Sequence, residues 1–161
     1  MPQSKGIVVG GLGNSLMTDE GVGLCVVREL AAMSERFSNV DFVELGSSLM
    51  NVVHAIAGRR KAVLIDCALM DEPAGTIRRF SPDEVVSTKP MAHFSLHEGD
   101  LLHVLELSRR LGECPEEVVI FGIQPQSMAL GDGLSSMLRE RLKDYVKMIG
   151  AELRVALSRR E

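Results

Sequence analysis

The most informative segment of the chain lies near its start and reads Ile7-Val8-Val9-Gly10-Gly11-Leu12-Gly13-Asn14-Ser15-Leu16-Met17-Thr18-Asp19-Glu20-Gly21-Val22-Gly23. Its apolar beginning predicts a buried strand, its glycines a turn, and its two carboxylates the start of a helix. Glycine permits backbone conformations and close approaches that other residues do not make. The turn therefore brings Asp19 and Glu20 to the carboxyl end of a first strand, where open α/β sheets bind their ligands.

The same glycines allow a nucleotide-binding interpretation, which is the weaker alternative. Gly11 and Gly13 match the first two glycines of a dinucleotide fingerprint, but Leu16 stands where the third belongs. Two acidic residues at the start of the helix would also repel a pyrophosphate, which seeks the positive end of the helix dipole.

Size and composition predict one domain and exclude several function classes. The chain has 161 residues, of which 45% are hydrophobic, and this suffices for a single domain over 1–161. A net charge of -4 argues against nucleic acid as a partner. No apolar run approaches the roughly 20 residues of a membrane span, and we expect no signal peptide. Three cysteines without a C-x-x-C pair favour a reducing compartment, so we predict a cytoplasmic monomer.

Apolar strand-like runs alternate with segments of helical period, which predicts an α/β fold with a mostly parallel sheet covered on both sides. Strands are expected at 6–10, 40–45, 62–67, 76–80 and 117–123, and helices at 19–35, 49–57, 98–111 and 134–157. The turn at 71–75 is too short for a parallel crossover, so we expect the strand 76–80 to be an antiparallel neighbour or an edge.

Asp19 and Glu20 are the first candidates for chemistry. Both could simply complement the helix dipole, which is worth about 0.3–1 kcal/mol each. Successive helical residues point about 100° apart, so we expect the pair to divide its roles. One side chain then caps the helix while the other faces the cleft.

Asp66 is the second candidate, because it ends the apolar run Val63-Leu64-Ile65 and an unpaired buried carboxylate is costly. The alternative is an aspartate that bonds nearby backbone amides. We expect Cys67 to be a small buried hydrophobe on the opposite strand face, with a soft metal ligand as the other reading.

His97 is the third candidate, in a polar loop at 91–100 that leads into a helix. A lone loop histidine is often merely exposed, and His93 competes with it for any functional role. Two carboxylates and an imidazole suit a borderline divalent ion such as nickel or zinc. A serine hydrolase is disfavoured because the chain has no G-x-S-x-G elbow.

Several segments together resemble the nickel–iron hydrogenase maturation endopeptidases. The matching motifs are Gly13-Asn14-x-Leu16-x-x-Asp19-Glu20-Gly21-x-Gly23, Asp66, Pro73-Ala74-Gly75-Thr76, Ser95-x-His97, Gly122-Ile123-x-Pro125-x-Ser127 and Gly131-x-Gly133-Leu134-Ser135. They occur in this order and extend over nearly the whole chain.

The resemblance implies a three-layer α/β/α sandwich around a five-stranded twisted sheet. It implies an endopeptidase that removes a short carboxyl-terminal peptide from the nickel-loaded precursor of a hydrogenase large subunit. Glu20, Asp66 and His97 correspond to the family's metal-contacting, catalytic residues. Nickel is expected to arrive with the precursor, and cadmium or zinc to substitute for it. A water polarised by the metal or assisted by a carboxylate would attack the peptide.

The chain departs from the family pattern after the predicted second strand. Relatives carry an Asp-Gly-Gly-Thr-like turn there, whereas this chain has Glu44-Leu45-Gly46-Ser47-Ser48, which bears on which precursor is recognised. We predict that Asn14, Asp19, Glu44, Gly46 and Ser47 bind the substrate. The alternative function is a nickel-sensing or chaperone domain that binds the same precursor without cutting it.

Methionines in or beside predicted loops are candidates for a partner surface, because methionine adapts to apolar peptides. They are Met17, Met50, Met70 and Met128. The alternative is that they fill gaps beneath the loops.

Overall fold

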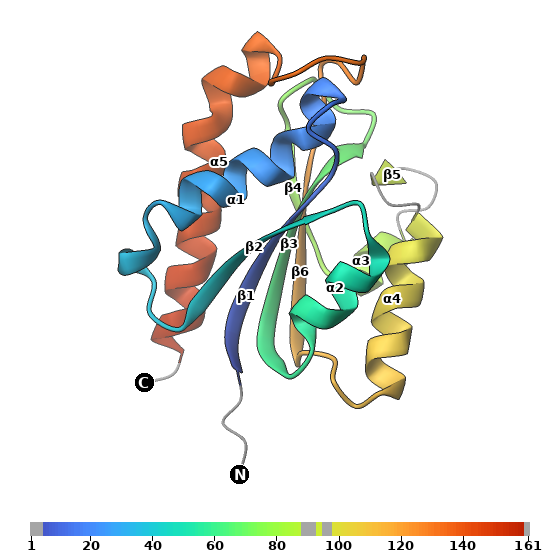
Figure 1. Ribbon diagram of the computed structural model, residues 1–161, viewed down its shortest axis with the longest axis vertical. Coiled ribbons are helices and arrows are strands. Elements are labelled where there is room, and N and C mark those ends of the chain that lie inside the picture. Colours follow the sequence, from blue (N-terminus) through green and yellow to red (C-terminus); the bar gives the residue numbers. More distant parts are fainter. Residues whose placement is uncertain (1–4, 88–92, 95–97, 160–161) are drawn as a thin grey trace.

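The computed structural model describes residues 5–87, 93–94 and 98–159, which form a sheet between two layers of helices (Figure 1). The strands are β1 Lys5–Leu12, β2 Val40–Gly46, β3 Arg59–Leu69, β4 Ile77–Phe80, β5 His93–Phe94 and β6 Glu117–Ile123. The α-helices are α1 Val22–Ala31, α2 Leu49–Ile56, α3 Pro82–Ser87, α4 Glu98–Arg110 and α5 Ser136–Ser158, and the 3₁₀ turns are η1 Thr18–Gly21 and η2 Ser34–Arg36. No helix in these ranges is both long and apolar enough to cross a membrane.

The strands follow the order β2-β1-β3-β6-β4, and β5 pairs with β3 away from this path. β1, β2, β3 and β6 run parallel, so their carboxyl ends meet at one edge. β4 lies at the edge of the sheet, antiparallel to β6. The predicted α/β fold with a mostly parallel five-stranded sheet and an antiparallel edge strand is therefore confirmed, with β5 as an additional short strand.

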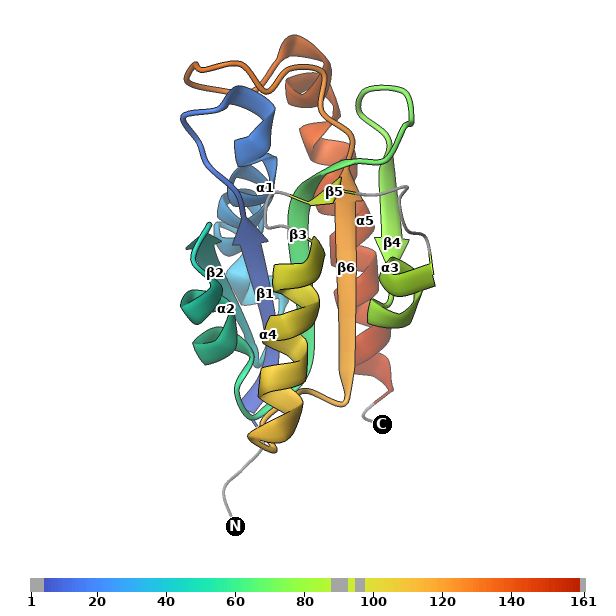
Figure 2. The ribbon, with the colours of Figure 1, turned by 90° about the vertical axis from the view of Figure 1, so that its right-hand side faces the viewer.

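Alternate residues of the central strands enter two separate cores, one on each face of the sheet. Val63, Ile65 and Cys67 of β3 pack with α1 and α5, whereas Leu64 and Ala68 pack on the face covered by α2 and α4. Figure 2 shows α4 in front of the sheet and α5 behind it. Because both faces of β3 are buried, its apolar run is not interrupted by polar residues.

Two predicted elements have different bounds in the structure, and two observed elements were not predicted. The expected helix 19–35 is divided into η1, α1 and η2. No local pattern indicated α3 or β5, which are short. β3 extends to Leu69, beyond the predicted end at 67, because Ala68 and Leu69 pair with Phe94 and His93 of β5.

Candidate functional site

Glycines dock the start of α1 onto the carboxyl ends of β1 and β3. Gly13 has a φ of +125°, and a side chain on it would collide with the carbonyl oxygen of Glu20. A Cβ on Gly23 would collide with the carbonyl oxygens of Leu12 and Ile65. Glycine at these two positions allows η1 and its Glu20 to lie close to the end of β1 and beside β3.

Asp66 is fully buried just beyond the point where β1 and β3 part. Their pairing ends at Gly11 and Ile65, and β3 continues beside β6. The amide of Cys67 donates to the Asp66 carboxylate at 2.8 Å. The structure thus brings Glu20 and Asp66 to the same edge of the sheet.

Cys67 confirms the reading of a small buried side chain on the face opposite Asp66, since it belongs to the α1/α5 core. Burial is the main cause that raises the pKa of its thiol, and the charges of Asp66, Glu20 and Asp19 add to it. The thiol is therefore protonated at neutral pH.

Asp19 has no exposed surface, and its carboxylate accepts four hydrogen bonds from the segment between β6 and α5. Its Oδ2 accepts from the amides of Gln126 at 2.9 Å and Ser127 at 3.0 Å, and from the Ser135 hydroxyl at 2.7 Å. Its Oδ1 accepts from the Ser135 amide at 2.7 Å. Of the acidic pair, Asp19 therefore has the structural role, and its carboxylate is enclosed by the chain instead of facing a substrate.

The other residues predicted to bind the substrate lie along the ends of β1 and β2. Asn14 accepts a hydrogen bond from the Leu16 amide at 3.0 Å, and Gly13 donates to the Gly46 carbonyl at 2.9 Å. Glu44 forms an ion pair with Arg28 of α1 at 2.7 Å. Ser47 is exposed. These contacts fix the shape of the edge, and the substrate roles stay predictions.

His97 lies outside the described residues. His93 is described by its backbone, which pairs in β5 with Leu69 at the end of β3. In the described ranges no three histidine, cysteine or acidic side chains are grouped to hold a metal ion. The ligand set of Glu20, Asp66 and His97 therefore stays a prediction, of which two members share one edge.

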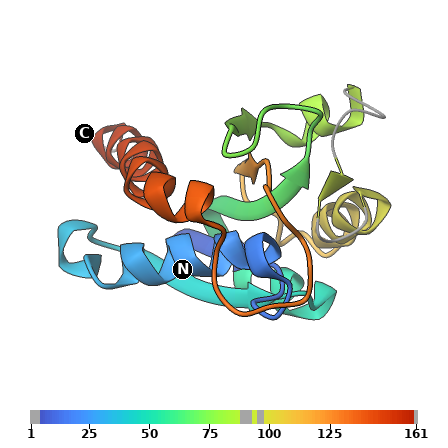
Figure 3. The ribbon, with the colours of Figure 1, turned by 90° about the horizontal axis from the view of Figure 1, so that it is seen from above.

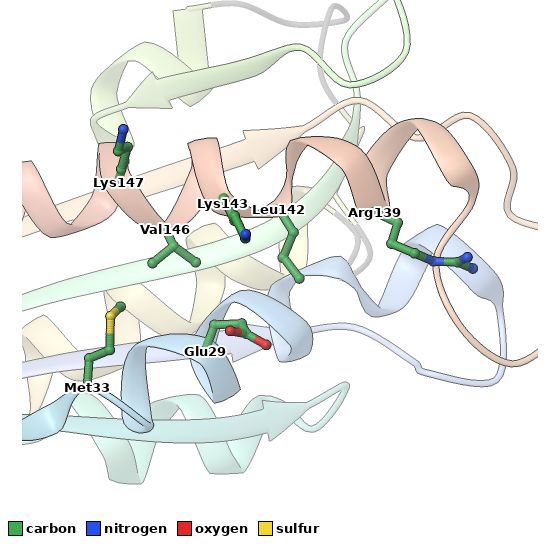
Figure 4. A pocket seen from close by; sticks show the side chains of 7 residues that line it. All are labelled: Glu29, Met33, Arg139, Leu142, Lys143, Val146 and Lys147. Atoms are coloured by element: carbon green, nitrogen blue, oxygen red, sulfur yellow. The ribbon is translucent and has the colours of Figure 1, made fainter.

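A separate hollow of about 360 Å³ lies between α1 and α5 (Figure 4). Met33, Leu142 and Val146 supply its apolar walls, and Lys143 and Lys147 lie at its rim. It opens on the outer side of the helices and shares no residue with the carboxyl edge of the sheet. We therefore do not assign it to the site.

Comparisons with known proteins agree with this architecture. A family model described as hydrogenase maturation protease matches residues 24–152, a range that contains Asp66 and position 97 and begins after Gly23. The hydrogenase expression/formation protein HupD of Thiocapsa roseopersicina is 30% identical over 143 residues, covering 88% of this chain. The Hydrogenase 2 maturation protease of Escherichia coli (strain K12) is 28% identical over 151 residues, which cover 92% of this chain and 90% of that protein.

Among solved structures, the hydrogenase maturating endopeptidase HybD from E. coli superposes with a TM-score of 0.77. The identity is 26%, and the match covers 93% of each chain. The present chain spans 65% of the length of the Thiocapsa protein, slightly less than two thirds.

Proposed function

Because the chain belongs to the hydrogenase maturation protease family, we propose that it removes a short carboxyl-terminal peptide from the nickel-loaded large-subunit precursor of a nickel–iron hydrogenase. The family membership predicted from the motifs is confirmed by the comparisons. The nickel, the large-subunit precursor and the terminal peptide belong to the proposal.

The observation that carries the proposal is the convergence of Glu20 and Asp66 at one edge of the sheet. They come from η1 and β3, and Gly23, at the start of α1 just after η1, lets the chain approach the Ile65 carbonyl of β3 closely. Two carboxylates together with the imidazole of His97 would form a donor set that suits nickel, zinc or cadmium. The nickel is the precursor's cargo, so these side chains would hold the substrate by its metal.

The chain's residues would then orient the precursor for hydrolysis. A water molecule adds to the carbonyl carbon of the scissile peptide, the C–N bond breaks, and the leaving nitrogen takes up a proton. Glu20 and Asp66 hold the precursor, and Asp19 keeps the loops around them in place through its four hydrogen bonds. The bound nickel supplies the charge by which a loaded precursor is recognised.

The test is to incubate the purified protein with nickel-loaded and nickel-free large-subunit precursor and to weigh the products by mass spectrometry. We expect only the loaded precursor to lose a peptide. Glu20→Gln and Asp66→Asn each remove a negative charge from the metal site, and His97→Ala removes the imidazole ligand. Each should lower the cleavage rate more than about 100-fold. Glu113→Gln and His103→Ala change exposed residues of the same types and should leave the rate unchanged.

Two outcomes would contradict parts of the proposal. A loaded precursor that binds but keeps its mass would favour the nickel-sensing or chaperone alternative. Loss of activity in His93→Ala but not in His97→Ala would show that His93, and not His97, is the imidazole ligand. Cadmium and zinc can replace nickel in the loaded precursor to compare the metals directly.

A further inference from the structure

The carboxyl edge of the sheet carries large apolar side chains that remain exposed. Of the eight exposed large apolar side chains in the described ranges, four lie in the segments at or after the carboxyl ends of β1, β2, β3 and β6. Their exposed fractions are 62% for Leu16, 53% for Met50, 43% for Leu69 and 82% for Leu130. Single exposed apolar residues are common, but here one lies at or shortly after the carboxyl end of each parallel strand.

Leu16 and Leu130 are held beside each other by the backbone. The Gly131 amide donates to the Leu16 carbonyl at 2.9 Å, and the Thr18 amide donates to the Gly131 carbonyl at 3.0 Å. The Thr18 hydroxyl reaches two further carbonyls of the same loop, those of Ser127 and Ala129, at 2.8 and 3.0 Å. Figure 3 looks onto this edge and shows the two loops side by side.

This arrangement shows that the two leucines are presented on an ordered platform. Thr18 adopts a φ of +49°, a conformation that is uncommon for residues other than glycine and is compensated here by its hydroxyl hydrogen bonds. The loop that carries Leu130 is also the loop that Asp19 anchors, one residue before Glu20. The apolar surface and the candidate metal site are therefore built on the same loops.

We propose that Leu16, Met50, Leu69 and Leu130 form an apolar rim that binds an apolar segment of the precursor beside the peptide bond to be cut. The inference rests on the proposed function, because the occupant is the precursor held at Glu20 and Asp66. Burial of exposed apolar surface drives association, and an ordered platform loses little conformational freedom on binding. Met50 is the one of the four loop methionines that is exposed, whereas Met70 is buried beneath the sheet edge.

The test compares the double variant Leu16→Ser/Leu130→Ser with the matched control Leu107→Ser/Leu111→Ser, whose leucines are exposed at the far end of α4. Initial cleavage rates are measured over a range of nickel-loaded precursor concentrations. We expect the rim variant to raise KM at least tenfold with kcat within twofold of wild type. The control should change neither value, and Leu16→Met/Leu130→Met should restore the wild-type KM.

Unchanged KM in the rim variant, or a fall in kcat alone, would overturn the inference while leaving the proposed function intact. Failure of the wild-type protein to cut the loaded precursor would instead overturn the proposed function and the rim with it. Urea unfolding midpoints of both double variants check that they fold. If Leu16→Ser/Leu130→Ser does not fold, the single variant Leu130→Ser takes its place in the comparison. If sedimentation shows that the wild-type protein is a dimer and the rim variant a monomer, the rim binds a second copy of the chain, and the proposal is overturned.

Discussion

The two ends of the sheet compensate buried charge in different ways. At the amino end, the buried Lys61 of β3 lies 2.9 Å from Glu152 of α5 and 3.2 Å from Glu117 of β6. Arg79 of β4 pairs with Glu152 as well, at 2.8 Å. At the carboxyl end, the buried Asp19 is compensated by three amides and a hydroxyl.

The difference matters for what each end can bind. Ion pairs neutralise one another, so the amino end has little electrostatic attraction left for a ligand. Hydrogen bonds from amides stabilise a carboxylate without cancelling its charge. The carboxylate of Asp19 therefore still adds negative charge to the carboxyl end, which favours a cation there.

The largest loss of stability is expected for Asp19→Ala. The substitution leaves four part-buried donors without their charged acceptor, and we expect the free energy of unfolding to fall by about 3 kcal/mol or more. Urea unfolding followed by far-UV circular dichroism measures the change. Asp132→Ala, an exposed aspartate in the same loop, is the control and should stay within about 0.5 kcal/mol of wild type. A loss below about 1 kcal/mol for Asp19→Ala would show that water replaces the carboxylate.

Lys61→Ala tests the ion pairs of the amino end. It leaves Glu117 and Glu152 without one partner, but Glu117 is partly exposed and Arg79 remains, so we expect a loss of about 2 kcal/mol. Cleavage of the precursor should not change. Arg110→Ala removes an exposed i,i+4 pair with Glu106 on α4 and should cost about 0.3–0.5 kcal/mol. Equal effects of the two variants would contradict the role given to the buried pair.

The same network predicts how stability depends on acid pH. Burial opposes ionisation of Glu152, but hydrogen bonds and charges from Arg79 and Lys61 outweigh it and lower the pKa of this carboxyl. The unfolded chain therefore binds the proton first as the pH falls below about 4.5, and folding stability decreases through the lower folded-state pKa. Urea unfolding from pH 7 to pH 3.5 should show this decrease, and Lys61→Ala should make it shallower.

Local sequence patterns predicted the elements of the sheet well. The apolar run Val63-Leu64-Ile65 is typical of a strand buried on both faces. Each residue of such a strand must be apolar whatever its neighbours are, so the pattern can be read locally. The short turn before β4 likewise indicated an antiparallel edge, because no parallel crossover fits in so few residues. Local patterns failed where pairing with a distant segment decides the outcome, as for the extension of β3 by β5.

Sequence patterns identified the residues of the candidate site better than they identified what each residue does. The motif singled out Asp19 and Glu20, but the donors to Asp19 lie 107 to 116 residues further along the chain. No local pattern shows that one carboxylate of a pair will meet those donors. Lys61 was missed for the same reason, since its partners are 56 and 91 residues away. Exposure of Leu130 is likewise a property of the folded loop.

A smaller loss of stability than for Asp19→Ala or Lys61→Ala is expected at Tyr145, which links α5 to the turn before β4 by an uncharged hydrogen bond. Its hydroxyl donates to the Gly75 carbonyl at 2.7 Å, so Tyr145→Phe should cost about 1 kcal/mol. Burial raises the pKa of Tyr145 to about 12, with Arg141 opposing the shift and Asp19 adding to it. The contribution of Tyr145 to folding stability should therefore be fully present below pH 10 and be lost as the pH rises toward 12, and Tyr145→Phe should remove this alkaline decrease.

Tyr145 is the single tyrosine of a chain without tryptophan, so phenolate absorbance at alkaline pH reports this group alone. A folded protein whose tyrosine titrates near 10, as it should in urea, would contradict the burial of this hydroxyl against the Gly75 carbonyl. Such a result would sharpen the contrast with the amino end of the sheet, where Lys61 is buried in ion pairs. The carboxyl end would be open to water, and its carboxylates would attract a cation less strongly than the amide-lined site predicts.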